Sequence, residues 1–257
     1  MMLLIDAGNT RIKWALAAPD AAPGDWLDYG AVMHADAARL PAAWQAAHAA
    51  RAAQGRSPVA SVLAANVAGA ALSQQLEQML AAALPGAGIE WFASVPERAG
   101  VRNGYRNPAQ LGCDRFAAAI GAHALAPGKA LIVANCGTAT TIDAVSADGV
   151  FLGGMILPGL GLMATSLARN TAQLPQVAQG GKLPSGFADN TDDAILSGLL
   201  AAQAGAIEHA CALHRADLCL VSGGAAGYIA PALPAGIPHR LVDNIVLIGL
   251  HAAAGSA

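Results

Sequence analysis

The feature that most constrains this chain is a pair of similar segments, one in each half of the sequence. Residues 3–16 run from an apolar stretch into Asp6, turn at Gly8, and continue with apolar residues at alternate positions. This pattern predicts a strand, a tight polar turn and a second strand. Residues 131–145 repeat the layout around Gly137. The repeat predicts two related domains that face a shared cleft.

The two turns carry the kinds of groups that hold a phosphate and its magnesium ion, namely backbone N–H groups, hydroxyls, an ammonium and a carboxylate. In the first turn these groups come from Asp6, Gly8, Asn9, Thr10 and Lys13, and in the second from Gly137 and Thr138. An ordinary hairpin is the alternative for either segment taken alone. Two such segments arise by chance far more rarely than one.

Composition sets the class of protein. The 257 residues suit one large domain or two small ones, and they are 55% apolar and only 12% charged, with a net charge of −3. This charge favours neither nucleic acid nor an anionic membrane as a partner. We expect no signal peptide, because the sequence reaches Asp6 early and lacks a basic segment before it. The apolar residues 150–168 are broken by Pro158 and glycines, so we do not expect them to span a membrane. The four cysteines show no CxxC spacing. We therefore expect a cytoplasmic protein with free thiols.

The remaining sequence alternates strands with helices, which indicates an α/β fold. Apolar residues at helical spacing predict helices over residues 37–54, 70–84, 160–170 and 192–214, and a last helix from about residue 243. The polar residues 98–112 predict a long loop, and loops of this length are usually functional. A strand over residues 218–221 is followed by Ser222, Gly223 and Gly224, where a group such as adenosine can approach the backbone closely.

Four motifs in this order make the sequence resemble the type III pantothenate kinases, which belong to the wider fold of acetate kinase, sugar kinases, Hsp70 and actin. Residues 6–10 with Lys13 resemble the first phosphate motif of that family, and residues 135–143 resemble the second. Residues 222–225 resemble the adenosine motif. Residues 105–115, Tyr-Arg-Asn-Pro-Ala-Gln-Leu-Gly-Cys-Asp-Arg, are similar to the pantothenate motif Y-x-N-P-x-x-L-G-x-D-R, which is the most family-specific of the four.

The resemblance implies two ribonuclease-H-like domains of the actin-like type around a nucleotide cleft. Residues 1–116 would form an N-terminal domain that binds phosphate and pantothenate. Residues 117–257 would form a C-terminal nucleotide-binding domain, with the last helix packing back on the first domain. The implied reaction is ATP-dependent phosphorylation of pantothenate to 4′-phosphopantothenate, the first step of coenzyme A biosynthesis, by direct in-line transfer.

The same resemblance implies roles for individual residues around the pantothenate. Asp114 would act as the base that orients the attacking hydroxyl and accepts its proton. Tyr105, Gly112, Cys113 and Arg115 would contact the substrate. The alternative for Asp114 is a cap on a helix that begins at Arg115. The alternatives for Tyr105 and Arg115 are an exposed loop aromatic and a solvated helix charge.

The resemblance also implies roles for the residues that bind the nucleotide. Gly137 and Thr138 would bind the β- and γ-phosphates, and Ser222, Gly223 and Gly224 would frame the adenosine. Asp6 would hold Mg²⁺ through water. Lys13 would touch phosphate, or else remain a solvated charge on its strand.

Thr191 is similar to a family threonine that reaches the substrate from the partner subunit. This implies a homodimer with the site at its interface, and residues 176–190 would then form a lid. The alternative is that Thr191 caps the long helix that follows it.

Asn135 departs from the family pattern, which usually carries aspartate at this position. In the family that carboxylate helps to bind a monovalent cation such as K⁺ or NH₄⁺. An amide supplies one oxygen and no charge, so we expect weak or absent activation by potassium.

Two other functions remain open from the sequence. The first is another small-molecule kinase of the superfamily, such as an N-acetyl sugar kinase, although the motif at residues 105–115 argues against it. The second is a non-catalytic, nucleotide-binding regulator related to accessory factors for transcription. The sequence has no basic helix-turn-helix element, which argues against direct DNA binding. Loss of activity in Asp114→Asn with nucleotide binding intact favours the kinase, and an inert wild type favours the regulator.

Overall fold

The computed structural model describes residues 1–55, 57–177 and 186–255, and these residues form two compact units. The first unit combines Met1–Ala126 with Ile245–Ala257, and the second is Pro127–Asn244. All four cysteines are free. Most of the segment expected to form a lid, residues 178–185, lies outside the described residues.

The first unit is built on a five-stranded sheet with the strand order β3-β2-β1-β4-β5. Its strands are β1 Met2–Ala7, β2 Arg11–Ala17, β3 Trp26–Met33, β4 Ser61–Asn66 and β5 Gly88–Trp91. β1 pairs antiparallel with β2 and parallel with β4. Every residue of β1 is buried, as expected for a central strand that is covered by helices on both faces.

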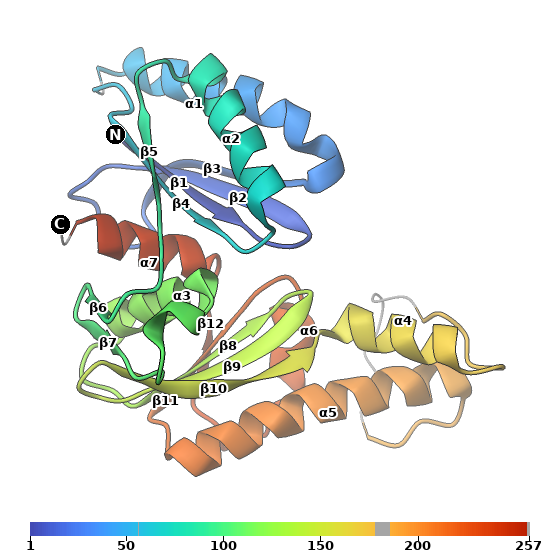
Figure 1. Cartoon of the computed structure of the whole chain (residues 1–257). Helices are drawn as coiled ribbons and strands as arrows, with labels where there is room; N and C mark the ends of the chain where they lie inside the picture. Colours follow the sequence, from blue (N-terminus) through green and yellow to red (C-terminus); the bar gives the residue numbers. More distant parts are fainter. Residues whose placement is uncertain (56, 178–185, 256–257) are drawn as a thin grey trace. The chain divides into compact units, whose positions relative to one another are not determined.

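Helices cover both faces of this sheet (Figure 1). They are the 3₁₀ helix η1 His34–Arg39, α1 Leu40–Ala52, α2 Ala70–Ala83, α3 Cys113–Leu125 and α7 Ile245–Ala254. The apolar positions of α1 and α2, including Trp44 and Leu76, pack with Leu3 and Ile5 of β1 into one core. α3 and α7 lie on the other side of the sheet (Figure 1).

Two glycines allow α3 and α7 to pack in close contact. A Cβ placed on Gly249 would overlap the backbone carbonyl of Ala117, and one placed on Gly121 would lie 2.6 Å from the carbonyl oxygen of Ile245. The helix backbones therefore meet without intervening side chains, which only glycine permits. This contact explains why the last helix belongs to the first unit.

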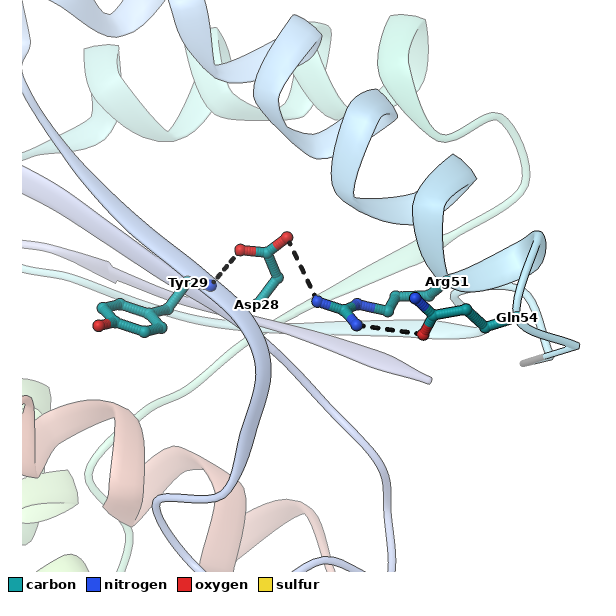
Figure 2. A network of polar contacts seen from close by, with 4 residues as sticks. All are labelled: Asp28, Tyr29, Arg51 and Gln54. Carbon is teal, nitrogen blue, oxygen red and sulfur yellow. Dashed lines mark hydrogen bonds and ion pairs between the residues drawn. The ribbon is translucent and has the colours of Figure 1, made fainter.

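A small polar network joins the edge strand β3 to the end of α1 (Figure 2). One carboxylate oxygen of Asp28 accepts a hydrogen bond from the backbone N–H of Tyr29, and the other lies 3.9 Å from the guanidinium of Arg51. Arg51 also donates to the side chain of Gln54 at 3.1 Å. These groups are partly exposed, so the network contributes little stability and chiefly orients the last turn of α1.

The strands of the second unit are hydrogen-bonded in the order β12-β11-β8-β9-β10. They are β8 Leu131–Cys136, β9 Ala139–Val145, β10 Val150–Pro158, β11 Leu218–Ser222 and β12 His239–Leu241. The helices of this unit are α4 Leu160–Asn170, α5 Thr191–His214, α6 Ala226–Ile229 and the 3₁₀ helix η3 Ala230–Ala232. α5 runs along the sheet (Figure 1), and its apolar face supplies much of the core.

α5 is also long and apolar enough to cross a membrane by length and composition, with 24 residues and a mean hydropathy of 1.2. Half of its most apolar window is buried inside the unit. The core helix of a soluble protein has the same properties, so this feature alone is weak support for a membrane span.

The structure differs from the sequence-based expectations in three places. The helix expected from residue 37 is preceded by the 3₁₀ helix η1, and α1 begins only at Leu40. The expected loop over residues 98–112 contains a hairpin of β6 Glu97–Arg98 and β7 Val101–Asn103, followed by the 3₁₀ helix η2 Pro108–Gln110. Two- and three-residue strands leave no detectable apolar periodicity. The compact units divide after Ala126 rather than after Phe116, because α3 is one continuous helix that packs on α7.

Candidate active site

The first turn connects β1 to β2 and is closed by its own backbone. The N–H of Gly8 donates to the carbonyl of Arg11 at 3.1 Å. Asn9 and Thr10, between them, are exposed. The turn therefore presents accessible backbone and a hydroxyl at the end of a buried strand, which suits a phosphate group.

The side chain of His34 makes a hydrogen bond to the backbone of this turn. Its Nε2 lies 2.8 Å from the carbonyl oxygen of Gly8. A carbonyl can only accept a hydrogen bond, so Nε2 must carry the proton. The backbone N–H of His34 also donates to the carbonyl of Thr10 at 3.4 Å. The start of η1 thus holds both ends of the turn.

Asp6 and Lys13 face each other across the two strands that flank the turn. They occupy paired positions in the β1–β2 register, and the Nζ of Lys13 lies 3.6 Å from Oδ2 of Asp6. Lys13 is therefore paired and largely covered rather than a solvated charge. Burial raises the pKa of the Asp6 carboxyl to about 6, the charge of Lys13 lowers it, and the charge of Asp114 raises it again. A carboxylate oxygen at the end of a strand is a group that can hold a magnesium ion.

Asp114 lies in the first turn of α3, within electrostatic reach of Asp6. The N-cap of α3 is Gly112 and the helix begins at Cys113, so the alternative that Asp114 caps a helix starting at Arg115 is wrong. Oδ1 of Asp114 accepts the backbone N–H of Arg115 at 2.8 Å. Burial raises the pKa of the Asp114 carboxyl, while the N–H and the charge of Arg115 act against it. A raised pKa makes this carboxylate a better base than an exposed aspartate.

Gly112 allows the Asp114 side chain to fold back over the helix start. A Cβ at Gly112 would lie 2.8 Å from Oδ1 of Asp114, closer than real Cβ atoms approach a neighbouring atom. A larger residue would push the carboxylate aside. The glycine therefore serves the position of Asp114 by making room for it.

Arg115 and Tyr105 form a pair beside this carboxylate. Arg115 is only 7% exposed, so the alternative of a solvated helix charge is wrong. Its guanidinium donates to the hydroxyl of Tyr105 at 2.8 Å and lies 5.7 Å from the centre of the tyrosine ring. The backbone N–H of Tyr105 donates to the side chain of Asn103 at 3.1 Å. A buried cation and a phenol are suited to a ligand that carries a carboxylate and hydroxyl groups.

The carboxyl end of β4 adds a residue that sequence reasoning missed. Asn66 is adjacent to Ala7 in the parallel β1–β4 register. Its backbone carbonyl accepts a hydrogen bond from the thiol of Cys113 at 3.5 Å. Burial raises the pKa of the Cys113 thiol to about 11, and the charge of Asp114 contributes. Cys113 is therefore a protonated thiol that ties the start of α3 to the end of β4.

The second turn, in the second unit, is one residue shorter than the first and carries no ionised side chain. The N–H of Gly137 donates to the carbonyl of Ala139 at 3.0 Å, and Thr138 is exposed. The N–H of Gly159 donates to the carbonyl of Thr138 at 2.9 Å. A Cβ on Gly159 would overlap the carbonyl of Gly137. The chain around Gly159 therefore packs directly against this turn.

The residues expected to frame adenosine lie at the neighbouring strand end. Ser222 pairs with Asn135 in the parallel β8–β11 register. Gly223 has a φ of 93°, which favours glycine, and a Cβ there would overlap the carbonyl of Cys136. Gly224 is exposed. Ligands of open α/β sheets bind at the carboxyl ends of parallel strands, and these residues occupy such an edge.

Thr191 is the first residue of α5, and its side chain is exposed. The helix is capped by Asn190, whose side-chain oxygen accepts the N–H of Asp193 at 3.0 Å, so the alternative that Thr191 is the cap is wrong.

Apart from Thr191, the structure places the expected site residues in two groups. The first unit groups Asp6, Gly8, Asn9, Thr10, Lys13, Tyr105, Gly112, Cys113, Asp114 and Arg115, and the second unit groups Asn135, Gly137, Thr138, Ser222, Gly223 and Gly224.

The arrangement of sheets and turns is that of a known class of protein. The structure resembles a Baf family transcriptional activator from Campylobacter jejuni, with a TM-score of 0.57 at 19% identity over 96% of this chain and 92% of that one. It also resembles a 2-dehydro-3-deoxygalactonokinase from Sinorhizobium meliloti, with a TM-score of 0.55 at 18% identity over 99% and 98% of the two chains. The predicted α/β fold is confirmed, because these solved structures share it over almost the whole chain.

The sequence comparisons define the family within this class. Residues 2–213 match the family model of the type III pantothenate kinases. The type III pantothenate kinase of Herminiimonas arsenicoxydans is 54% identical over 263 residues, which cover 99% of this chain and 97% of that protein. That of Janthinobacterium sp. (strain Marseille) is 56% identical over 266 residues, with the same coverage. The chain belongs to the type III pantothenate kinase family, as its four motifs predicted.

Proposed function

We propose that this enzyme transfers the γ-phosphoryl group of ATP to the hydroxyl of pantothenate, forming 4′-phosphopantothenate for coenzyme A biosynthesis. Membership of the type III pantothenate kinase family supports the reaction and both substrates. The observation that carries the catalytic assignment is Asp114, a carboxylate with a raised pKa beside the buried Arg115–Tyr105 pair. Direct transfer needs no nucleophile from the protein.

Asp114 orients the pantothenate hydroxyl and accepts its proton as the new P–O bond forms. In a loose transition state the proton leaves late, so positioning contributes more than basicity. Arg115 and Tyr105, with Gly112 and Cys113, hold the pantothenate so that its hydroxyl faces Asp114. The carboxylate of pantothenate is the natural partner of the Arg115 guanidinium.

The two turns hold the triphosphate. Gly8, Asn9, Thr10 and Lys13 bind phosphate from the first unit, and Gly137 and Thr138 bind the β- and γ-phosphates from the second. Ser222, Gly223 and Gly224 accommodate the adenosine. Asp6, a buried carboxylate on β1, would hold Mg²⁺ through water. When bound, the ion offsets the negative charge that develops on the phosphates.

The enzyme would work as a cytoplasmic homodimer in which Thr191 of one subunit completes the pantothenate site of the other. The exposed side chain of Thr191 at the start of α5 is compatible with this role. A mixing experiment tests it. The variants Asp114→Asn and Thr191→Ala would each be nearly inactive. Refolded together, they should recover about a quarter of the wild-type activity, because half of the dimers are mixed and one site in each mixed dimer is intact. No recovery would contradict a shared site.

The reaction itself is tested with purified protein, ATP, Mg²⁺ and pantothenate, and the product is identified by mass spectrometry. We expect 4′-phosphopantothenate. A folded protein that binds nucleotide and yields no product would overturn the catalytic assignment and favour a regulatory protein.

The same assay tests the role of Asn135 in cation activation. With an amide at this position, we expect the rate to change less than about twofold between potassium, sodium and ammonium salts. Asn135→Asp should make the rate depend on potassium. Strong potassium activation of the wild type would contradict the proposal.

A further inference from the structure

Gln203 is an amide that is completely buried in the middle of α5. It is 0% exposed, and its neighbours on the same helical face, such as Leu199, Leu200 and Ile207, are apolar core residues. A polar side chain in such a position requires an explanation, because burying an amide without full hydrogen bonding costs free energy.

The amide makes one well-defined hydrogen bond to the backbone of another element. Its Nε2 donates to the carbonyl oxygen of Pro158 at 2.8 Å and also lies 3.0 Å from Sδ of Met163. The carbonyl can only accept, so the orientation of the amide is fixed. Its Oε1 is buried without a hydrogen-bond partner among the described residues.

Pro158 leads directly to the second turn. It is the last residue of β10 and pairs with Ala139. The next residue, Gly159, donates its N–H to Thr138 and has no room for a side chain beside Gly137. Contacts therefore run from Gln203 through Pro158 and Gly159 to the turn, all within the second unit.

Stability does not account for the amide. Leucine has a similar size and would suit the apolar face of α5, and it would remove the buried Oε1 at the cost of one hydrogen bond. The exchange leaves the Pro158 carbonyl without this donor, a cost that removal of the unpartnered Oε1 offsets. The bond to Pro158 does, however, fix the chain segment that packs against the Gly137–Thr138 backbone.

We propose that Gln203 is a positioning residue for the nucleotide. By holding Pro158, it fixes Gly159 and so the orientation of the peptide groups at Gly137 and Thr138 that bind the phosphates of ATP. The inference rests on the proposed function, in which this turn binds the triphosphate. It assigns Gln203 no contact with substrate and no role on the pantothenate side.

The test compares Gln203→Leu with a matched core variant on the next turn of the same helix, Ile207→Val. For Gln203→Leu we expect a KM for ATP about five- to tenfold higher, a KM for pantothenate within twofold, and a melting temperature close to that of the wild type. Isothermal titration with a non-hydrolysable ATP analogue should show the same weakening. Ile207→Val should lower the melting temperature and leave both KM values unchanged.

The possible results distinguish a positioning role of Gln203 from a purely structural one. If Gln203→Leu loses stability while its KM for ATP stays within twofold, the amide is merely structural and the proposal is wrong. Gln203→Met, which keeps the length and flexibility of the side chain, is the second variant if Gln203→Leu does not fold. If neither folds, the amide is required for folding and the positioning role is overturned. An inactive wild type would instead count against the proposed function.

Discussion

The two turns are each closed by a hydrogen bond from a glycine N–H, and they are stabilised by different physical means. The first turn lies beside ionised groups, since Asp6 and Lys13 face each other at its base and Asp114 acts on Asp6 through its charge. The second turn is flanked by Asn135 and a buried Cys136, and it is fixed by the close packing of Gly159 and Gly223. The side chain of His34 donates to the carbonyl of Gly8 in the first turn, whereas that of Gln203 donates to the carbonyl of Pro158, which pairs with Ala139 of the second turn.

This difference shows that turns with a similar sequence layout can be stabilised in different ways. The first turn can respond to protons and cations, because its carboxylates have raised pKa values. The second turn carries no carboxylate and depends on the close packing of Gly159 and Gly223 against its backbone. Changes of charge should therefore act through the first turn, and changes of side-chain volume through the second.

The largest effect is expected for a substitution of Asp114, whose charge acts on Asp6 beside the first turn. Asp114→Asn should lower kcat about 100- to 10,000-fold, because the amide cannot accept the proton of the attacking hydroxyl. Steady-state kinetics measure the loss. Nucleotide affinity and melting temperature should stay near the wild-type values, and a residual rate within tenfold of the wild type would remove Asp114 from the role of base.

The next largest effect is expected when the side-chain volume is increased at Gly223, beside the second turn. Gly223→Ala should lower the free energy of unfolding by about 3 kcal/mol and weaken ATP binding, because the new methyl overlaps the carbonyl of Cys136 at a positive φ. Urea denaturation and nucleotide titration measure the two effects. Gly227→Ala, in the short helix that follows, is the matched control, since a Cβ there meets open space. Equal effects at the two positions would show that close packing is not the cause.

The raised pKa of Asp6 makes stability depend on pH in a defined direction. Below the ordinary carboxyl pKa of 3.8, Asp6 is protonated in both the folded and the unfolded state. Between there and the folded pKa of about 6, the unfolded state ionises first, so the folded state loses up to about 3 kcal/mol as the pH rises.

Asp6→Asn should remove this loss. In magnesium-free buffer, the variant should be more stable than the wild type at pH 8 and equal to it near pH 3.5, as measured by urea denaturation at each pH. It should also lose activity. A stability difference that does not change with pH would contradict the raised pKa.

The smallest effect is expected for loss of the hydrogen bond between His34 and the carbonyl of Gly8 in the first turn. His34→Ala should raise the KM for ATP a few-fold, in line with the roughly 1 kcal/mol of one hydrogen bond. His34→Gln places an amide N–H near the position of Nε2 and should restore the wild-type value. If glutamine is no better than alanine, the bond to Gly8 does not support the turn.

Much of this molecule was predictable from the sequence, because the motifs are continuous. The strand–turn–strand segments are local, and their alternating apolar residues and glycines specify the turns without distant contacts. The motif at residues 105–115 identified the family for the same reason. The helices at residues 70–83 and 191–214 begin and end close to where their periodicity predicted.

The remaining features depend on partners that are remote in sequence. His34 and Gly8 are 26 residues apart, and Gln203 and Pro158 are 45 apart. No pattern in the sequence relates a histidine or glutamine to a particular carbonyl. Likewise, a charged arginine in the first turn of a helix is expected in solvent, and only the tertiary structure shows that Arg115 is buried against Tyr105. Tertiary context overrides local preference at such residues.

The close contact of α7 with α3 has a consequence for how the chain is made. The second unit is one continuous segment and is complete once Asn244 has been synthesised. The first unit lacks its final 10-residue helix until the whole of the second unit has been synthesised. The half of the protein that the ribosome produces first is therefore the half that finishes folding last, with the α3 surface around Gly121 uncovered in the meantime. A nascent chain that stalls before Ile245 would expose this surface to chaperones and proteases.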